Sequence, residues 1–179
     1  MNDILLQEIE SYLSENYLYY EDEKKPQIMA SARIKFSFKG NETPPPREPI
    51  SFPRRIKNYI DAMFSTIEDD DTFGGYVGKL IRERSLTDAE VYKKADMDRR
   101  LFSKIRRNRN YQPSRSTALS LAIALELDME ETQQLLQRAG FTLSKGSKSD
   151  VIVMCFIERG EYDRFLINEV LDHYNCGTL

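Results

Sequence analysis

The chain has 179 residues, of which 40% are hydrophobic, and a formal net charge of −3. An apolar fraction of this size can fill a packed core, which excludes a chain that is disordered along its whole length. The sequence contains no run of about 20 apolar residues, so we expect neither a membrane-spanning helix nor a membrane partner.

The N-terminal third predicts a helix, a strand and a proline-rich connector. Residues 3–18 place apolar side chains at helical spacing, which indicates an amphipathic helix that needs a partner surface. Residues 32–39 alternate apolar and polar side chains and predict a half-buried strand. Because a single strand leaves backbone groups unpaired, either a second strand lies near residues 27–29 or the strand pairs outside the segment, which we favour. The prolines of residues 44–53 predict an extended linker.

Two helices are expected between this linker and the centre of the chain. The first spans residues 54–66, where apolar residues recur at helical spacing. The second is weakened at its start by Gly74 and Gly75, since each glycine costs about 1 kcal/mol relative to alanine inside a helix. We therefore expect the regular helix to begin near Tyr76.

Residues 86–107 predict two short helices joined by a tight turn. Their inward positions recur at helical spacing and are occupied by Val91, Ala95, Phe102 and Ile105, with Met97 in the turn. Thr87 and Asp98 precede the two helices, where a side-chain oxygen can accept unpaired backbone N–H groups. The outward face of the second helix carries Arg99, Arg100, Ser103 and Lys104.

Further helices are expected to follow this pair. Asn108 is suited to a left-handed helix end, and Ser114 or Ser116 can cap the next helix. Asp128 can cap the helix after that, which Gly140 ends.

The C-terminal segment predicts a pair of helices, residues 150–158 and 162–174, separated by a glycine. Their apolar surface is expected to pack on the core or to form a dimer contact. Cys155 lies in an apolar run and is expected to be buried. With Cys176 and the single His173 it forms no metal-binding pattern, so we expect no metal and no cofactor. Free cysteines fit a reducing, cytoplasmic location.

Positive charge is concentrated in the middle of the chain. Residues 76–115 contain 12 basic and 5 acidic residues, whereas residues 116–179 contain 5 and 10. A basic segment between acidic neighbours indicates a polyanionic partner, although a solvated helix face would give the same pattern.

The central segment resembles the Cro/repressor-like (lambda-repressor-like) helix-turn-helix family. The similarity is carried, in order and spacing, by Leu86-Thr87, Ala95-Asp96-Met97-Asp98, Phe102 to Ile105, Pro113-Ser114 and Thr117 through Leu127. It implies a five-helix DNA-binding domain over residues 71–141. The expected fold is thus mainly α: a five-helix repressor-like helix-turn-helix domain with a small α+β N-terminal extension and a C-terminal helical pair. The expected boundaries are 1–53, 54–142 and 143–179.

Three residues depart from the family's pattern. Asp88 replaces a glutamine that often contacts phosphate or base, and a carboxylate there would repel a phosphate. Tyr92 replaces a small residue and should push the two helices apart or tilt them. Asp96 replaces the turn glycine, but aspartate tolerates the left-handed conformation better than most residues.

The expected function is that of a non-enzymatic DNA-binding transcriptional regulator that docks the helix Arg99–Arg107 in the major groove of double-stranded DNA. Arg99 and Arg100 would read guanine edges, and Ser103 would contact a base or phosphate. Phosphates would be neutralised by Lys104, Arg106, Arg107 and Arg109.

An alternative is an interaction or accessory component of a larger assembly, of the phage-defence or toxin–antitoxin type. Its helix-turn-helix would hold a protein or a structured nucleic acid. A homodimer or a heterologous protein partner could form through residues 1–53 or the C-terminal helices. Asp88 discriminates between the two hypotheses, since ordinary docking meets repulsion if Asp88 faces the same surface as Arg99.

Overall fold

The computed structural model describes residues 3–20, 56–58, 62–63 and 72–179, and this part of the chain is mainly helical and contains no strand. The predicted strand at residues 32–39 and the proline-rich segment at 44–53 lie outside the described residues. Residues 1–24 and 68–179 form one compact unit. In a second unit, residues 25–67, the described positions 56–58 and 62–63 are helical, as predicted.

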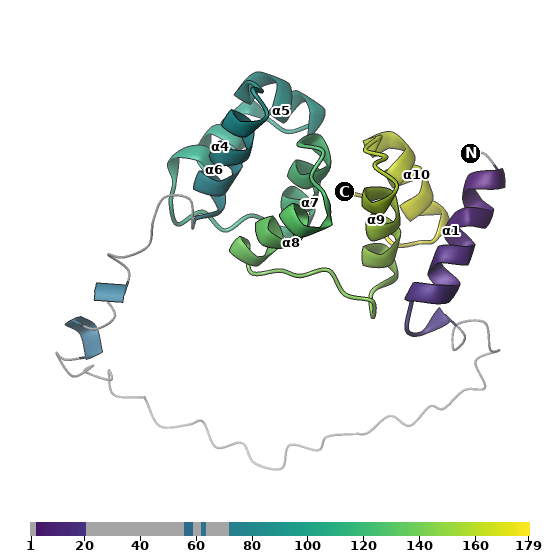
Figure 1. Ribbon diagram of the computed structural model, residues 1–179. Helices are drawn as coiled ribbons and strands as arrows, with labels where there is room; N and C mark the ends of the chain where they lie inside the picture. The colour runs from purple at the N-terminus through teal and green to yellow at the C-terminus, as the bar shows by residue number, and fades with distance from the viewer. Residues whose placement is uncertain (1–2, 21–55, 59–61, 64–71) are drawn as a thin grey trace, which may run out of the picture. The chain divides into compact units, whose positions relative to one another are not determined.

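From α4 to α10 the helices of the first unit follow one another with short connections (Figure 1). Their bounds are α1 Asp3–Asn16, α4 Phe73–Glu83, α5 Asp88–Lys94, α6 Arg99–Arg107, α7 Arg115–Ala124, α8 Met129–Arg138, α9 Lys148–Glu158 and α10 Arg164–His173. None of the helices that the structure describes combines the length and the apolar character needed to cross a membrane.

The core is built around α7 and α9, which are apolar on most of their circumference. Seven of the 10 residues of α7 and seven of the 11 residues of α9 are buried. Helix α8 packs against both, and α10 packs against both as well. Among the described residues Asp150 is the one buried acidic residue, and it accepts hydrogen bonds from Arg115 and from the backbone N–H of Ser144. Burial also raises the pKa of the Cys155 thiol to about 11, in keeping with its predicted apolar surroundings.

The predicted amphipathic helix α1 covers a helix of its own chain. It packs along α9, and its apolar residues Leu5, Ile9 and Leu13 are buried. At the rim of this contact Arg159 donates a hydrogen bond of 2.6 Å to Glu8. The partner surface that this helix required is therefore supplied within the unit.

The expected start of the helix at Tyr76 is wrong, because α4 begins three residues earlier at Phe73. Thr72 caps it by accepting a hydrogen bond of 3.0 Å from the N–H of Gly75. Gly74 has a packing role that the helix-propensity argument missed. A Cβ atom at this position would lie 2.1 Å from the carbonyl oxygen of Ile105 on α6. The glycine thus lets α4 and α6 approach closely, and this contact offsets the cost of placing it in a helix.

Most helix ends share one hydrogen-bonded motif. In α4, α5, α7, α8, α9 and α10, a residue with positive φ follows the helix, and the next N–H bonds to a carbonyl five residues earlier. Glycine occupies this position only in α8 and α9; the other four residues are Ser85, Asp96, Glu126 and Asn175. The expectation for Asp96 is thus confirmed. The expectation for Asn108 is wrong, since it is extended, with φ −99° and ψ 103°, and α6 ends without the motif.

Four predicted N-cap residues are confirmed. Thr87, Asp98, Ser114 and Asp128 each accept a backbone N–H from the first turn of the helix that follows. At Thr87 the bond is reciprocal, because its own N–H donates to Glu90. This hydrogen bond, together with one from the Thr87 hydroxyl, lowers the pKa of Glu90.

We predict that Gly74→Ala destabilises the protein by about 1–3 kcal/mol, because the new methyl group overlaps backbone atoms of α6 that cannot move alone. The free energy of unfolding in urea measures this effect. Gly146→Ala is the control, since its Cβ would find its nearest neighbour at 3.5 Å. Equal effects of the two substitutions would contradict the proposed role of Gly74.

Candidate nucleic-acid interface

Helices α5 and α6 are joined by a turn of fixed geometry. Asp96 adopts the left-handed conformation, with φ 49°, and the N–H of Met97 donates to the carbonyl oxygen of Tyr92 at 2.8 Å. Arg164 of α10 donates a hydrogen bond of 2.9 Å to the Asp96 carboxylate. The four predicted inward residues are all buried: Val91, Ala95, Phe102 and Ile105. The turn is thereby fixed both to the core and to α10.

Helix α6 presents one continuous polar face. Its residues Phe102 and Ile105 point inward, and the opposite side of the helix carries Arg99, Arg100, Ser103, Lys104 and Arg107. All five are exposed except Ser103, which is half-buried. The side chains of Arg99, Arg100 and Arg107 make no hydrogen bond or ion pair with any described residue. Lys104 lies 5.3 Å from the ring centre of Tyr111.

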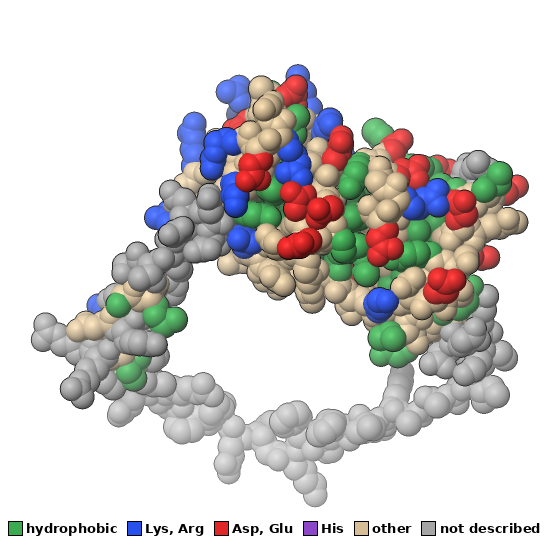
Figure 2. Space-filling model, viewed as in Figure 1, with side chains coloured by type: hydrophobic (Ala, Val, Ile, Leu, Met, Phe, Trp, Pro, Cys, Tyr) green, Lys and Arg blue, Asp and Glu red, His purple; other side chains and the backbone are tan. Residues whose placement is uncertain are grey.

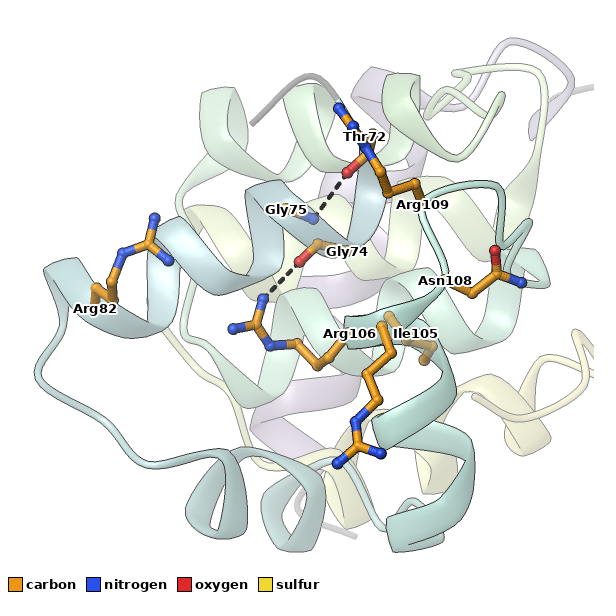
Figure 3. A pocket seen from close by; sticks show the side chains of 9 residues that line it. Thr72, Gly74, Gly75, Arg82, Ile105, Arg106, Asn108 and Arg109 are labelled. Atoms are coloured by element: carbon orange, nitrogen blue, oxygen red, sulfur yellow. Dashed lines mark hydrogen bonds between the residues drawn. The ribbon is translucent and has the colours of Figure 1, made fainter. Parts of the chain in front are cut away.

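Arg106 differs from the other basic residues of α6. It follows Phe102 by one helical turn and so lies at the margin of the buried face. Its Nη1 donates a hydrogen bond of 2.7 Å to the carbonyl oxygen of Gly74 (Figure 3). A Cβ atom at Gly78 would lie 1.9 Å from the same nitrogen, so the guanidinium lies across the surface of α4 at a position without a side chain. Arg106 therefore binds α6 to α4.

A hollow of about 310 Å³, the α5–α6 hollow, lies between α5 and α6. It is lined by Asp88, Ala89, Tyr92, Arg99, Phe102, Ser103, Arg106 and Arg107. Asp88 and Arg99 thus face the same surface. The Asp88 carboxylate also lies 3.7 Å from Nε of Arg106, which compensates part of its charge. The ring of Tyr92 packs on Phe102 with 6.0 Å between ring centres.

A second hollow, of about 390 Å³, lies between the start of α4 and the end of α6. Its lining is Thr72, Gly74, Gly75, Arg82, Ile105, Arg106, Arg107, Asn108 and Arg109. Figure 3 shows Arg109 turned toward Thr72, while Arg106 extends to Gly74. Arg109, predicted to contact phosphate, therefore lies at the same end of α6 as Arg106 and Arg107, whereas Arg99 and Arg100 lie at the opposite end.

Ion pairs neutralise many of the basic residues around α6. Arg84 pairs with Glu131, Lys94 with Glu126 and Arg115 with Asp150. The basic side chains of α6 have no such acidic partners among the described residues, apart from the Asp88 contact of Arg106. In the face drawn in Figure 2, Lys and Arg side chains gather over the end of the unit that holds α4, α5 and α6. The positive charge of the segment is thus concentrated on α6 and its surroundings.

The basic residues of α6 could be predicted from the sequence, but the residues that α4 contributes to the hollow beside them could not. Thr72, Gly74 and Arg82 line the hollow beside α6 although they lie 17 to 27 residues before the start of that helix. The sequence signal for this contribution was the Gly74–Gly75 pair. Glycine destabilises a helix, and close packing of another helix is one reason for its presence there.

The described residues contain no cluster of His, Cys, Asp and Glu that could hold a metal ion. Comparison with protein-family models, curated proteins and solved structures finds no match for the chain.

We predict that Arg106→Met and Arg107→Met, which are neighbours with the same chemical change, differ in their effect on stability. Arg106→Met should lower the free energy of unfolding by about 1–3 kcal/mol, because a charge-assisted hydrogen bond to α4 is lost. Arg107→Met should change it by less than about 0.5 kcal/mol. Urea unfolding of both variants tests this, and a larger loss for Arg107 than for Arg106 would refute the assignment.

Proposed function

We propose that this chain is a DNA-binding protein of the helix-turn-helix type, with α6 docked in the major groove, and that it regulates transcription. The observation that supports this best is the outward face of α6, where Arg99, Arg100 and Arg107 have no hydrogen bond or ion pair to another described side chain. Unpaired cations on an exposed helix are suited to a polyanion, and α6 is held from behind by buried residues. A helix about 10–12 Å across fits a major groove about 12 Å wide.

The residues of this face have different roles in the proposal. Arg99 and Arg100 at the start of α6 are suited to guanine, since a guanidinium can donate two hydrogen bonds to O6 and N7. Ser103 adds a shorter contact to base or phosphate. Lys104 and Arg107 neutralise phosphates, and Arg109 does so from the loop. A homodimer would present two copies of α6 to successive turns of the duplex.

Arg106 has a different role from the other six residues in the proposal. Its guanidinium hydrogen bonds to Gly74, and its side chain is 25% exposed. We assign it to holding α6 in place rather than to neutralising a phosphate. Its positive charge still adds to the local field.

A second candidate function is an interaction module within a larger assembly. Asp88 favours it, because the carboxylate lies on the same surface as Arg99 and is 56% exposed. A negative charge there opposes the approach of a phosphate backbone. A partner protein with its own basic residues would meet Asp88 favourably.

The deciding experiment is selection from a pool of genomic DNA fragments by the full chain and by the Arg99→Ala/Arg100→Ala double variant, at several salt concentrations. We expect the wild type to enrich a defined site, in a palindromic arrangement if the protein is a dimer, and the double variant to lose that enrichment.

The control is the Asp172→Asn variant, which changes an exposed carboxylate on α10. It should enrich the same site as the wild type. Uniform weak binding that disappears with salt, or no binding, would refute base reading and favour the interaction module.

A further inference from the structure

The position of Asp88 calls for an explanation, because the residue is not the cap of α5. The start of α5 is capped by Thr87 together with Glu90, through reciprocal hydrogen bonds. Asp88 is 56% exposed, so it does not support the core either. Its one ion pair with another described side chain is the 3.7 Å approach of Oδ1 to Arg106 Nε, which is longer than a hydrogen bond. The acceptor capacity of the carboxylate is therefore largely unused.

The surroundings of Asp88 are positively charged. Arg99, Arg106 and Arg107 line the same α5–α6 hollow as the carboxylate. These three cations outweigh one carboxylate, so the hollow as a whole attracts rather than repels a polyanion. A carboxylate in such a site can accept a hydrogen bond from a donor on DNA while the arginines bind the phosphates.

We propose that Asp88 is a specificity-determining residue that selects cytosine in the major groove, within the same site as the guanine read by Arg99. This inference rests on the proposed DNA-binding function and goes beyond it by assigning a base preference to a residue outside α6.

The choice of cytosine follows from donor and acceptor chemistry. A carboxylate only accepts hydrogen bonds, whereas a guanidinium only donates them. In the major groove the donors are the N4 amino group of cytosine and the N6 amino group of adenine. Adenine also presents its N7 acceptor beside N6, which repels a carboxylate, and guanine and thymine present no donor there. Cytosine is thus the base that satisfies Asp88 best.

The same donor and acceptor chemistry predicts how Asp88→Asn changes the preferred base. An amide both donates and accepts, and asparagine pairs in two places with N6 and N7 of adenine. Replacing Asp88 by asparagine should therefore change the preferred base at one position from cytosine to adenine. Asp88→Ala should remove the preference at that position while the guanine read by Arg99 stays selected.

The test is selection from a randomised duplex library by the wild type, Asp88→Asn, Asp88→Ala and the control Asp172→Asn, with sequencing of the bound DNA. We expect the wild type and the control to prefer cytosine at one position by at least about fivefold. Thermal unfolding of each variant shows that it is folded.

Three results would overturn the proposal. An unchanged preference at every position in Asp88→Asn would show that Asp88 reads no base. Uniformly tighter binding by Asp88→Ala, with the same selected site, would show that it only repels phosphate. If the wild type selects no site at all, the proposed function fails, and this inference fails with it. The first two results leave base reading by Arg99 and Arg100 intact, so failure of the inference is distinguishable from failure of the function.

Discussion

The contact between Arg106 and helix α4 is the constraint on which the arrangement of the basic segment depends. The guanidinium reaches the carbonyl oxygen of Gly74 and lies where Gly78 has no side chain. Close approach at two glycines one helical turn apart fixes both the distance and the rotation of α6 against α4. Because α6 ends without a left-handed cap, this contact, rather than a terminal turn, holds its last residues in place. The orientation of the outward face follows from it.

The distribution of charge is shaped by pairing as much as by sequence. Basic residues on the helices around α6 meet acidic residues of α8, α9 and the loop after α7. The arginines of α6 have no such counterparts among the residues described, except where Asp88 approaches Arg106. Ion pairing thereby concentrates the uncompensated positive charge of this segment on one exposed helix and the hollows beside it. Such a narrow positive surface is better suited to a specific polyanion than a diffuse excess of charge would be.

Features set by neighbours in the chain could be predicted from the sequence, and features set by distant contacts could not. The caps at Thr87 and Asp98 were predictable, because an N-cap needs only the side chain and the turn that follows. The inward role of Arg106 was not, since it depends on glycines about 30 residues away. Left-handed ends at residues such as Glu126 were missed because the fold, rather than the residue's preference, imposes them.

The separation of the two sides of α6 has a consequence for how this protein can change. The positions that hold the helix are 102, 105 and 106, and the positions directed outward are 99, 100, 103, 104 and 107. Substitutions at the exposed positions 99, 100 and 107 leave the buried contacts of α6 in place, so they are tolerated at little cost in stability. The outward surface of α6 can therefore change while the residues that hold the helix in place stay the same. Duplicated copies of such a gene could diverge in what they bind while keeping the same fold, and an engineer could exchange this face in the same way.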